Sequence, residues 1–135
     1  MKEKLIAFDL DGTIIDSAPD LTSALNHVLS LFNLESIDEK EVRSLIGNGA
    51  EALITEAFKR KGKSIENISE LKNIFLDQYK VCFKDKTKLY PDVAKVIKRF
   101  HKCGYILILV SNKPEFYCKE LLIHFKIMKY FSSVS

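Results

Sequence analysis

The chain has 135 residues, 47% of them hydrophobic, which suffices for one globular domain with a small insertion but not for two ordinary domains. Its 21 basic and 18 acidic residues give a formal charge of +3 without any long basic block, which argues against a nucleic-acid partner. The three cysteines form no C-x-x-C pair and no window approaches the roughly 18 apolar residues of a membrane span, so we expect a cytoplasmic protein with reduced thiols and no membrane contact.

The first predicted element is a short strand over residues 4–10, apolar on both faces as the buried strands of parallel sheets are. Four helices are predicted to follow it, and Ser17, Pro19 and Asp20 provide the start signals of the first. The predicted helical ranges are about 18–33, 35–47, 50–62 and 67–83.

Strand character returns only after these helices. A helix that opens at Pro91 and Asp92 and closes at Gly104 precedes a second buried strand, Tyr105 to Ser111. Another helix follows Pro114, and the run YFSSVS begins a third short strand. This order of elements predicts an α/β fold, a Rossmann-like parallel sheet with an α-helical insertion after its first strand.

Polar residues follow both predicted strands. The run FDLDGT places Asp9 and Asp11 after the first strand, and the second strand ends in Ser111, Asn112 and Lys113. In open parallel sheets ligands bind outside the carboxyl ends of the strands, so we expect these residues to share one site.

The residue types at this site suit phosphoryl transfer. A carboxylate attacks phosphorus when a cation neutralises the repulsion and a second group handles the leaving-group proton, and Asp9 and Asp11 fit these two roles. Hydroxyl, backbone N–H and ammonium donors hold phosphoryl oxygens, which suits Ser111, Asn112 and Lys113.

Simpler interpretations compete with this one. The D-x-D-G-T run is also compatible with a plain Asp-Gly turn. The segment from Ser111 to Pro114, taken alone, is an ordinary loop before a helix, with Lys113 at the surface. The strand before each polar cluster favours the phosphate site.

The stretch FDLDGTIIDSAPDL resembles the first motif of the haloacid dehalogenase superfamily of phosphohydrolases. Together with EVRSLIGNGA and YPDVAKVIKRFHKCGYILILVSNKPE it is most similar to bacterial phosphoglycolate phosphatases, over nearly the whole chain. The resemblance implies a superfamily core formed by residues 1–16 and 89–135. It also implies that the helices of residues 17–88 form a cap that closes over the substrate.

By this resemblance Asp9 is the nucleophile that becomes an aspartyl phosphate, and Asp11 is the general acid and then the base. Ser111 with Asn112 binds the phosphoryl group. Mg²⁺ is held by the Asp9 carboxylate and the Asp11 backbone carbonyl. The implied substrate is a small phosphomonoester similar to 2-phosphoglycolate, and a phosphomutase of the same superfamily is a lesser alternative.

The expected cap contains candidate substrate contacts. Gly47, Asn48 and Gly49 lie between two predicted helices, where backbone N–H groups could face an anionic group, and Arg43, one turn earlier, could pair with a carboxylate. A helix C-cap followed by a turn explains the glycines as well, and a solvated Arg43 is the simpler interpretation of that residue.

Relatives of this kind carry two further motifs after a third strand, a lysine and a pair of acids that complete the Mg²⁺ site. The chain ends where these would begin, so we expect a weakly held metal and an exposed apolar edge on the first strand. A truncated gene product, a partial record of a longer protein and a half completed by a second chain all explain this. The alternative function is a catalytically silent remnant or interaction module.

Overall fold

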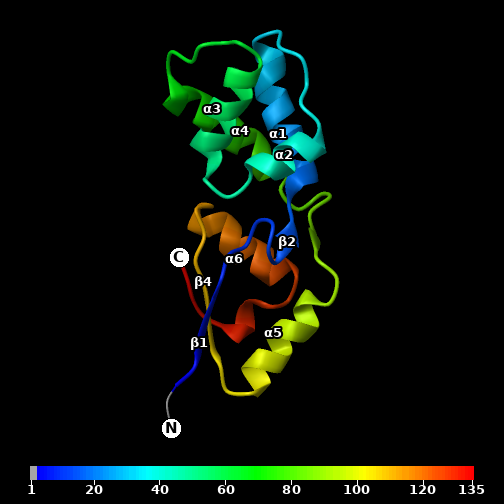
Figure 1. The fold of residues 1–135 in the computed structure, drawn as a ribbon, viewed down its shortest axis with the longest axis vertical. Helices are drawn as coiled ribbons and strands as arrows, with labels where there is room; N and C mark the ends of the chain where they lie inside the picture. Colours follow the sequence, from blue (N-terminus) through cyan, green and yellow to red (C-terminus); the bar gives the residue numbers. More distant parts are fainter. Residues whose placement is uncertain (1–2) are drawn as a thin grey trace. The chain divides into compact units, whose positions relative to one another are not determined.

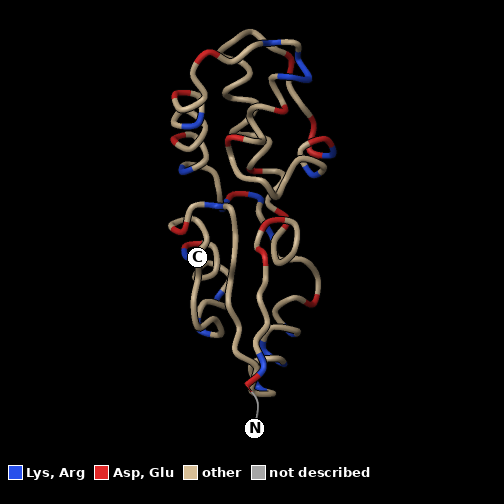
Figure 2. The backbone as a smooth tube through the Cα atoms, turned by 60° about the vertical axis from the view of Figure 1, so that its left-hand side comes forward, with Lys and Arg blue, Asp and Glu red and all other residues tan. Residues whose placement is uncertain are grey.

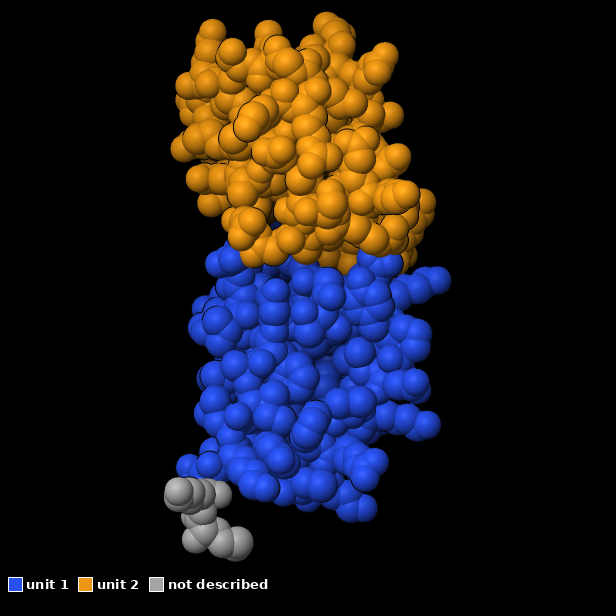
Figure 3. Space-filling model, in the orientation of Figure 1, with its two compact units in different colours: residues 1–16, 88–135 blue, residues 17–87 orange. Residues whose placement is uncertain are grey.

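The computed structural model describes residues 3–135, which form two compact units (Figure 3). One unit comprises the chain up to Asp16 together with Lys88–Ser135, and the other comprises Ser17–Thr87. The chain thus leaves the first unit once and returns to it at Lys88, one residue before the boundary expected from the sequence.

The first unit is built on a three-stranded parallel sheet (Figure 1). Strand β4 (Ile106–Leu109) lies between β1 (Leu5–Phe8) and β5 (Phe131–Val134). It pairs with β1 along the whole length of both strands, and its pairing with β5 changes register after Leu107. The parallel α/β fold predicted from the sequence is confirmed.

Helices α5 (Val93–Lys102) and α6 (Glu115–His124) connect these strands, with a 3₁₀ turn at Met128–Tyr130 before β5. Two strands too short to predict, β2 (Ile15–Asp16) and β3 (Lys88–Leu89), form an antiparallel ribbon in the same unit.

Strand β1 is an edge strand, and the prediction that it is buried on both faces is wrong. Leu107 and Leu109 of β4 are fully buried, whereas Leu5 of β1 is 60% exposed and Ala7 is also exposed. The physical reason is that none of the strands within residues 3–135 pairs with the second side of β1. The exposed edge of the first strand, expected from the resemblance, is present.

The second unit contains the four predicted helices, each within a few residues of its expected range. They are α1 (Ala18–Leu31), α2 (Glu39–Leu45), α3 (Ala50–Arg60) and α4 (Ile68–Cys82). Apolar residues from the stripes of all four helices form their common core: Leu25, Leu29, Val42, Ile54, Phe58, Phe75 and Tyr79. No helix among the described residues is long and apolar enough to cross a membrane.

Asp20 plays a different part from the one expected. Ser17 makes no side-chain capping bond, and the Asp20 carboxylate bonds residues far along the chain instead of capping the helix. It is 1% exposed and accepts hydrogen bonds from Lys86 N, Thr87 N and Thr87 Oγ1 at 2.7–3.1 Å. This carboxylate therefore ties the first turn of α1 to the last residues of its unit.

Charged residues of both signs are interspersed along most of the chain (Figure 2). The exception is α5, which carries four basic residues and no acid: Lys95, Lys98, Arg99 and Lys102.

Candidate active site

The loop after β1 is fixed by its own backbone. The Leu10 carbonyl accepts hydrogen bonds from the N–H groups of Thr13, Ile14 and Ile15 at 2.9–3.2 Å, and Leu10 itself is fully buried. The turn needs a positive φ at Gly12, which is +80°, a value that glycine adopts without strain. Asp11 is therefore carried on a closed, anchored turn directly after the strand.

Backbone bonds bring the end of β4 next to the end of β1. Val110 N donates to Phe8 O at 2.8 Å, and Ser111 N donates to Ser135 O at 2.8 Å, beyond the end of β5. Ser111 is therefore held between two strand ends and is half-buried, whereas Asn112 is exposed. The parallel pairing produces this arrangement, as expected from the sequence.

Lys113 and Asp11 form a shielded ion pair. The Lys113 Nζ lies 2.9 Å from Asp11 Oδ1 and 3.0 Å from Oδ2, and the two side chains are only 5% and 13% exposed. The interpretation of Lys113 as a surface loop residue is wrong, because its side chain is buried and its ammonium pairs with Asp11 in the loop after β1. A charge pair held this way joins the two polar clusters that the sequence singled out.

Asp9 is exposed at the end of β1. Its Oδ1 accepts a hydrogen bond from Leu10 N at 2.8 Å, which orients the carboxylate. An exposed, oriented carboxylate can be approached by a phosphorus atom, as a nucleophile requires.

Cys118 is a neighbour of this site that the sequence did not indicate. Its thiol, on α6, is fully buried and donates a hydrogen bond to the Lys113 carbonyl at 3.5 Å. Burial raises the pKa of this thiol, against opposing contributions from the Ser111 hydroxyl and the Lys113 ammonium; Asp11 and Asp9 add to the rise. The charged groups of the predicted site, Asp9, Asp11 and Lys113, thus all influence the pKa of this one buried thiol.

The donors present fit Mg²⁺ as a partial site. The Asp9 carboxylate and the Asp11 backbone carbonyl are hard oxygen donors from the two residues that flank Leu10. Mg²⁺ commonly keeps several waters beside one or two carboxylates. Within residues 3–135, no cluster of three or more His, Cys, Asp or Glu side chains could surround an ion. A bound Mg²⁺ would therefore depend on water and phosphate oxygens for its other ligands.

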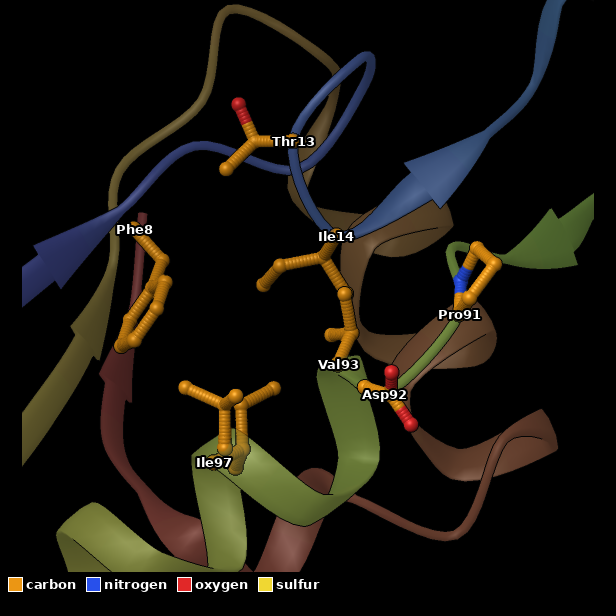
Figure 4. A pocket seen from close by; sticks show the side chains of 8 residues that line it. Phe8, Thr13, Ile14, Pro91, Asp92, Val93 and Ile97 are labelled. Carbon is orange, nitrogen blue, oxygen red and sulfur yellow. The ribbon is translucent and has the colours of Figure 1, made fainter.

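A small apolar cavity lies in the same unit (Figure 4). It measures about 120 Å³, and the side chains of Phe8, Ile14 and Ile97 point toward one another around it. Because its lining offers no basic group, it does not suit a phosphate ester.

The predicted cap contacts belong to the other unit. Arg43 is exposed on α2 and lies 3.5 Å from Glu39 in an exposed ion pair. Gly47 and Gly49 have φ values of +125° and +89°, and Gly49 is the N-cap of α3, so the turn explains both glycines. Asn48 is exposed between them. Contact of these four residues with a substrate stays a prediction.

Replacing Lys113 by Met should lower the free energy of unfolding by about 2–3 kcal/mol, because Asp11 would stay desolvated without its counter-ion. In urea unfolding, the double variant K113M/D11N should lose about 1–3 kcal/mol less stability than the sum of the losses measured for K113M and D11N alone. Lys119→Met is the matched control: its partner Glu115 lies 2.9 Å away, but both side chains are about half exposed, so it should change stability by less than about 0.5 kcal/mol. Strict additivity of K113M and D11N would contradict the coupling.

This chain is similar to known proteins in both sequence and fold. The family model of haloacid dehalogenase-like hydrolases matches residues 6–135. The phosphoglycolate phosphatase of Mesorhizobium japonicum is 35% identical over 100% of this chain and 60% of its own length, and that of Vibrio parahaemolyticus is 36% identical over 97% and 60%. The crystal structure of a predicted phosphoglycolate phosphatase from Haemophilus somnus aligns with a TM-score of 0.87 and 34% identity, covering 99% of this chain and 62% of that one.

The chain spans about 60% of the length of the curated relatives it matches. The family match covers nearly all of its own residues, including both polar clusters at the strand ends. The chain therefore belongs to the haloacid dehalogenase-like hydrolase family.

Proposed function

We propose that this chain carries the nucleophile and phosphate-binding half of a Mg²⁺-dependent phosphatase that hydrolyses a small phosphomonoester. The observation that carries the proposal is the convergence of Asp9, the Asp11–Lys113 pair and Ser111 at the carboxyl ends of β1 and β4. An exposed carboxylate at the same edge of the sheet as a fixed ammonium and a hydroxyl is a set of groups suited to a phosphoryl group.

The proposed chemistry has two steps. The Asp9 carboxylate attacks phosphorus, the bond to the leaving oxygen breaks, and Asp11, protonated in the complex with the ester, supplies the proton that this oxygen takes up. Water then attacks the phosphorus of the aspartyl phosphate, Asp11 accepts a proton from that water, and Asp9 is released with inorganic phosphate. Bound Mg²⁺ would supply neutralisation of the phosphoryl charge.

Ser111 and Lys113 have binding roles in this proposal. The Ser111 hydroxyl and the Lys113 ammonium would hold phosphoryl oxygens, with Asn112 as a third polar group at the loop. The Lys113 backbone N–H donates to Ser111 Oγ at 3.1 Å, which keeps the two residues in one compact loop.

The substrate is proposed from the relatives. The matched proteins of Mesorhizobium and Vibrio are named phosphoglycolate phosphatases, so 2-phosphoglycolate is the first ester to test. A phosphomutase would return a phosphorylated isomer instead of inorganic phosphate, so product determination separates the two.

The direct test is phosphate release from 2-phosphoglycolate by the purified chain, with Mg²⁺ and with Mg²⁺ removed by a chelator. We expect turnover with Mg²⁺ and its loss on chelation, restored when Mg²⁺ is added back. Circular dichroism should show that the chain is folded in both samples. A folded chain with no turnover in Mg²⁺ would favour the alternative, a silent interaction module of the same family.

A partner that completes the sheet is proposed from the open edge of β1. An apolar strand edge tends to pair with another chain, and the simplest partner is a second copy. We expect the chain to self-associate in sedimentation at micromolar concentration and Leu5→Lys to shift it toward the monomer. Val81→Lys, at a 75% exposed position of α4, is the matched control and should leave association unchanged. A monomeric parent chain would contradict the proposal.

A further inference from the structure

The buried thiol of Cys118 lies against the Ser111–Lys113 loop. Its S–H donates to the Lys113 carbonyl at 3.5 Å, and the Ser111 hydroxyl lowers the pKa of the thiol against the larger effect of burial. Because burial raises the pKa of Cys118, the thiol keeps its proton at neutral pH and is available as a donor.

A second bond joins the two residues of the loop. The Lys113 N–H donates to Ser111 Oγ at 3.1 Å. Because Ser111 Oγ accepts this bond, the hydroxyl keeps its own proton for a phosphoryl oxygen, while the thiol donates to the Lys113 carbonyl. The two bonds fix the Lys113 backbone directly and the Ser111 side chain through it.

The consequence for the site lies in the direction of the Lys113 side chain. Both Asp11 oxygens lie within 3.0 Å of Lys113 Nζ, so a small rotation of the Lys113 backbone would break one or both contacts. Cys118 is fully buried, so its thiol meets the Lys113 carbonyl inside the unit, away from solvent.

We propose that Cys118 is a positioning residue of this site, whose thiol holds the Ser111 hydroxyl and the Lys113 backbone in the arrangement that meets Asp11 and a phosphoryl group. The inference deepens the proposed function and rests on it, since the arrangement matters for turnover only if Ser111 and Lys113 bind phosphate. Cys118 itself touches no substrate atom.

The test uses Cys118→Ala and Cys118→Ser in the full chain, with Cys82→Ala as the matched control. Cys82 is also a buried thiol whose pKa burial raises, to about 11, and it also donates to a backbone carbonyl, that of Asp20 at 3.6 Å, but in the other unit. If C118A does not fold, Cys118→Val replaces it, because valine fills the volume without a donor.

The first readout is amide hydrogen exchange, which needs no activity. We expect the Lys113 amide to exchange about tenfold faster in C118A than in the parent, and C118S to restore most of the protection. The Ile106 amide, bonded to Lys4 O at 2.8 Å in the same unit, should stay within about twofold, which separates a loosened loop from general destabilisation. C82A should leave the Lys113 amide unchanged.

The second readout is inhibition by inorganic phosphate. We expect C118A to bind phosphate about fivefold more weakly, with C118S and C82A close to the parent. Unchanged Lys113 exchange in C118A, or an equal change in C82A, would overturn the positioning role. A parent chain that binds no inorganic phosphate would reject the proposed function instead, while the exchange measurement would still decide whether Cys118 holds the loop.

Discussion

Replacing Asp9 by Asn is expected to abolish turnover of phosphate esters, by about 10³-fold or more, while stability changes by less than about 0.5 kcal/mol. The neutral amide cannot attack phosphorus, so the covalent step is lost. Stability is spared because Asp9 is exposed and its bond from Leu10 N is one that the amide oxygen of Asn can also accept.

The comparison needs a carboxylate of the same unit that lies outside the site. Asp92, the N-cap of α5, is exposed and has a φ of +65°, a conformation that asparagine tolerates well. Asp92→Asn therefore makes the same chemical change without strain and should retain turnover. If D9N and D92N were equally active, Asp9 would not be the nucleophile.

Replacing Asp20 by Ala should produce a large loss of stability, about 3–4 kcal/mol. Three donors lose their acceptor at once, because Lys86 N, Thr87 N and Thr87 Oγ1 all bond this carboxylate. Thermal or urea unfolding measures the change.

Graded variants identify the cause. Thr87→Val removes one of the three donors and should cost about 1 kcal/mol. Asp20→Asn keeps the shape but turns an amide N–H₂ toward backbone donors, so it should fall between T87V and D20A. A cost for D20A no larger than that of T87V would show that the buried carboxylate does not hold α1 to the end of its unit.

The elements with clear periodicity could be predicted from the sequence alone. The apolar stripes of the four inserted helices and the run ILIL of β4 carry their own signal, and the structure places each near its expected range. That Asp11 and Lys113 lie close together could also be predicted, because the carboxyl ends of parallel strands lie at the same edge of a sheet.

Features that depend on distant neighbours could not be predicted. The sequence LIAF is equally compatible with a central and an edge strand, and only the pairing shows that β1 is open on one side. Asp20 looks like an ordinary first-turn acid until the chain returns, after more than sixty residues, with Lys86 and Thr87. Cys118 gives no motif, because its role depends on a loop five to seven residues earlier folding back over it.

The central claim is that Asp9 becomes phosphorylated, and the most direct measurement looks for that bond. The chain is mixed with 2-phosphoglycolate and Mg²⁺, quenched in acid within the first turnover, and digested for mass spectrometry. The account predicts one added phosphoryl group on the peptide that contains Asp9, removed by hydroxylamine as an acyl phosphate is, and absent from D9N. Phosphate release by the parent chain without any such label, or a label that persists in D9N, would contradict it.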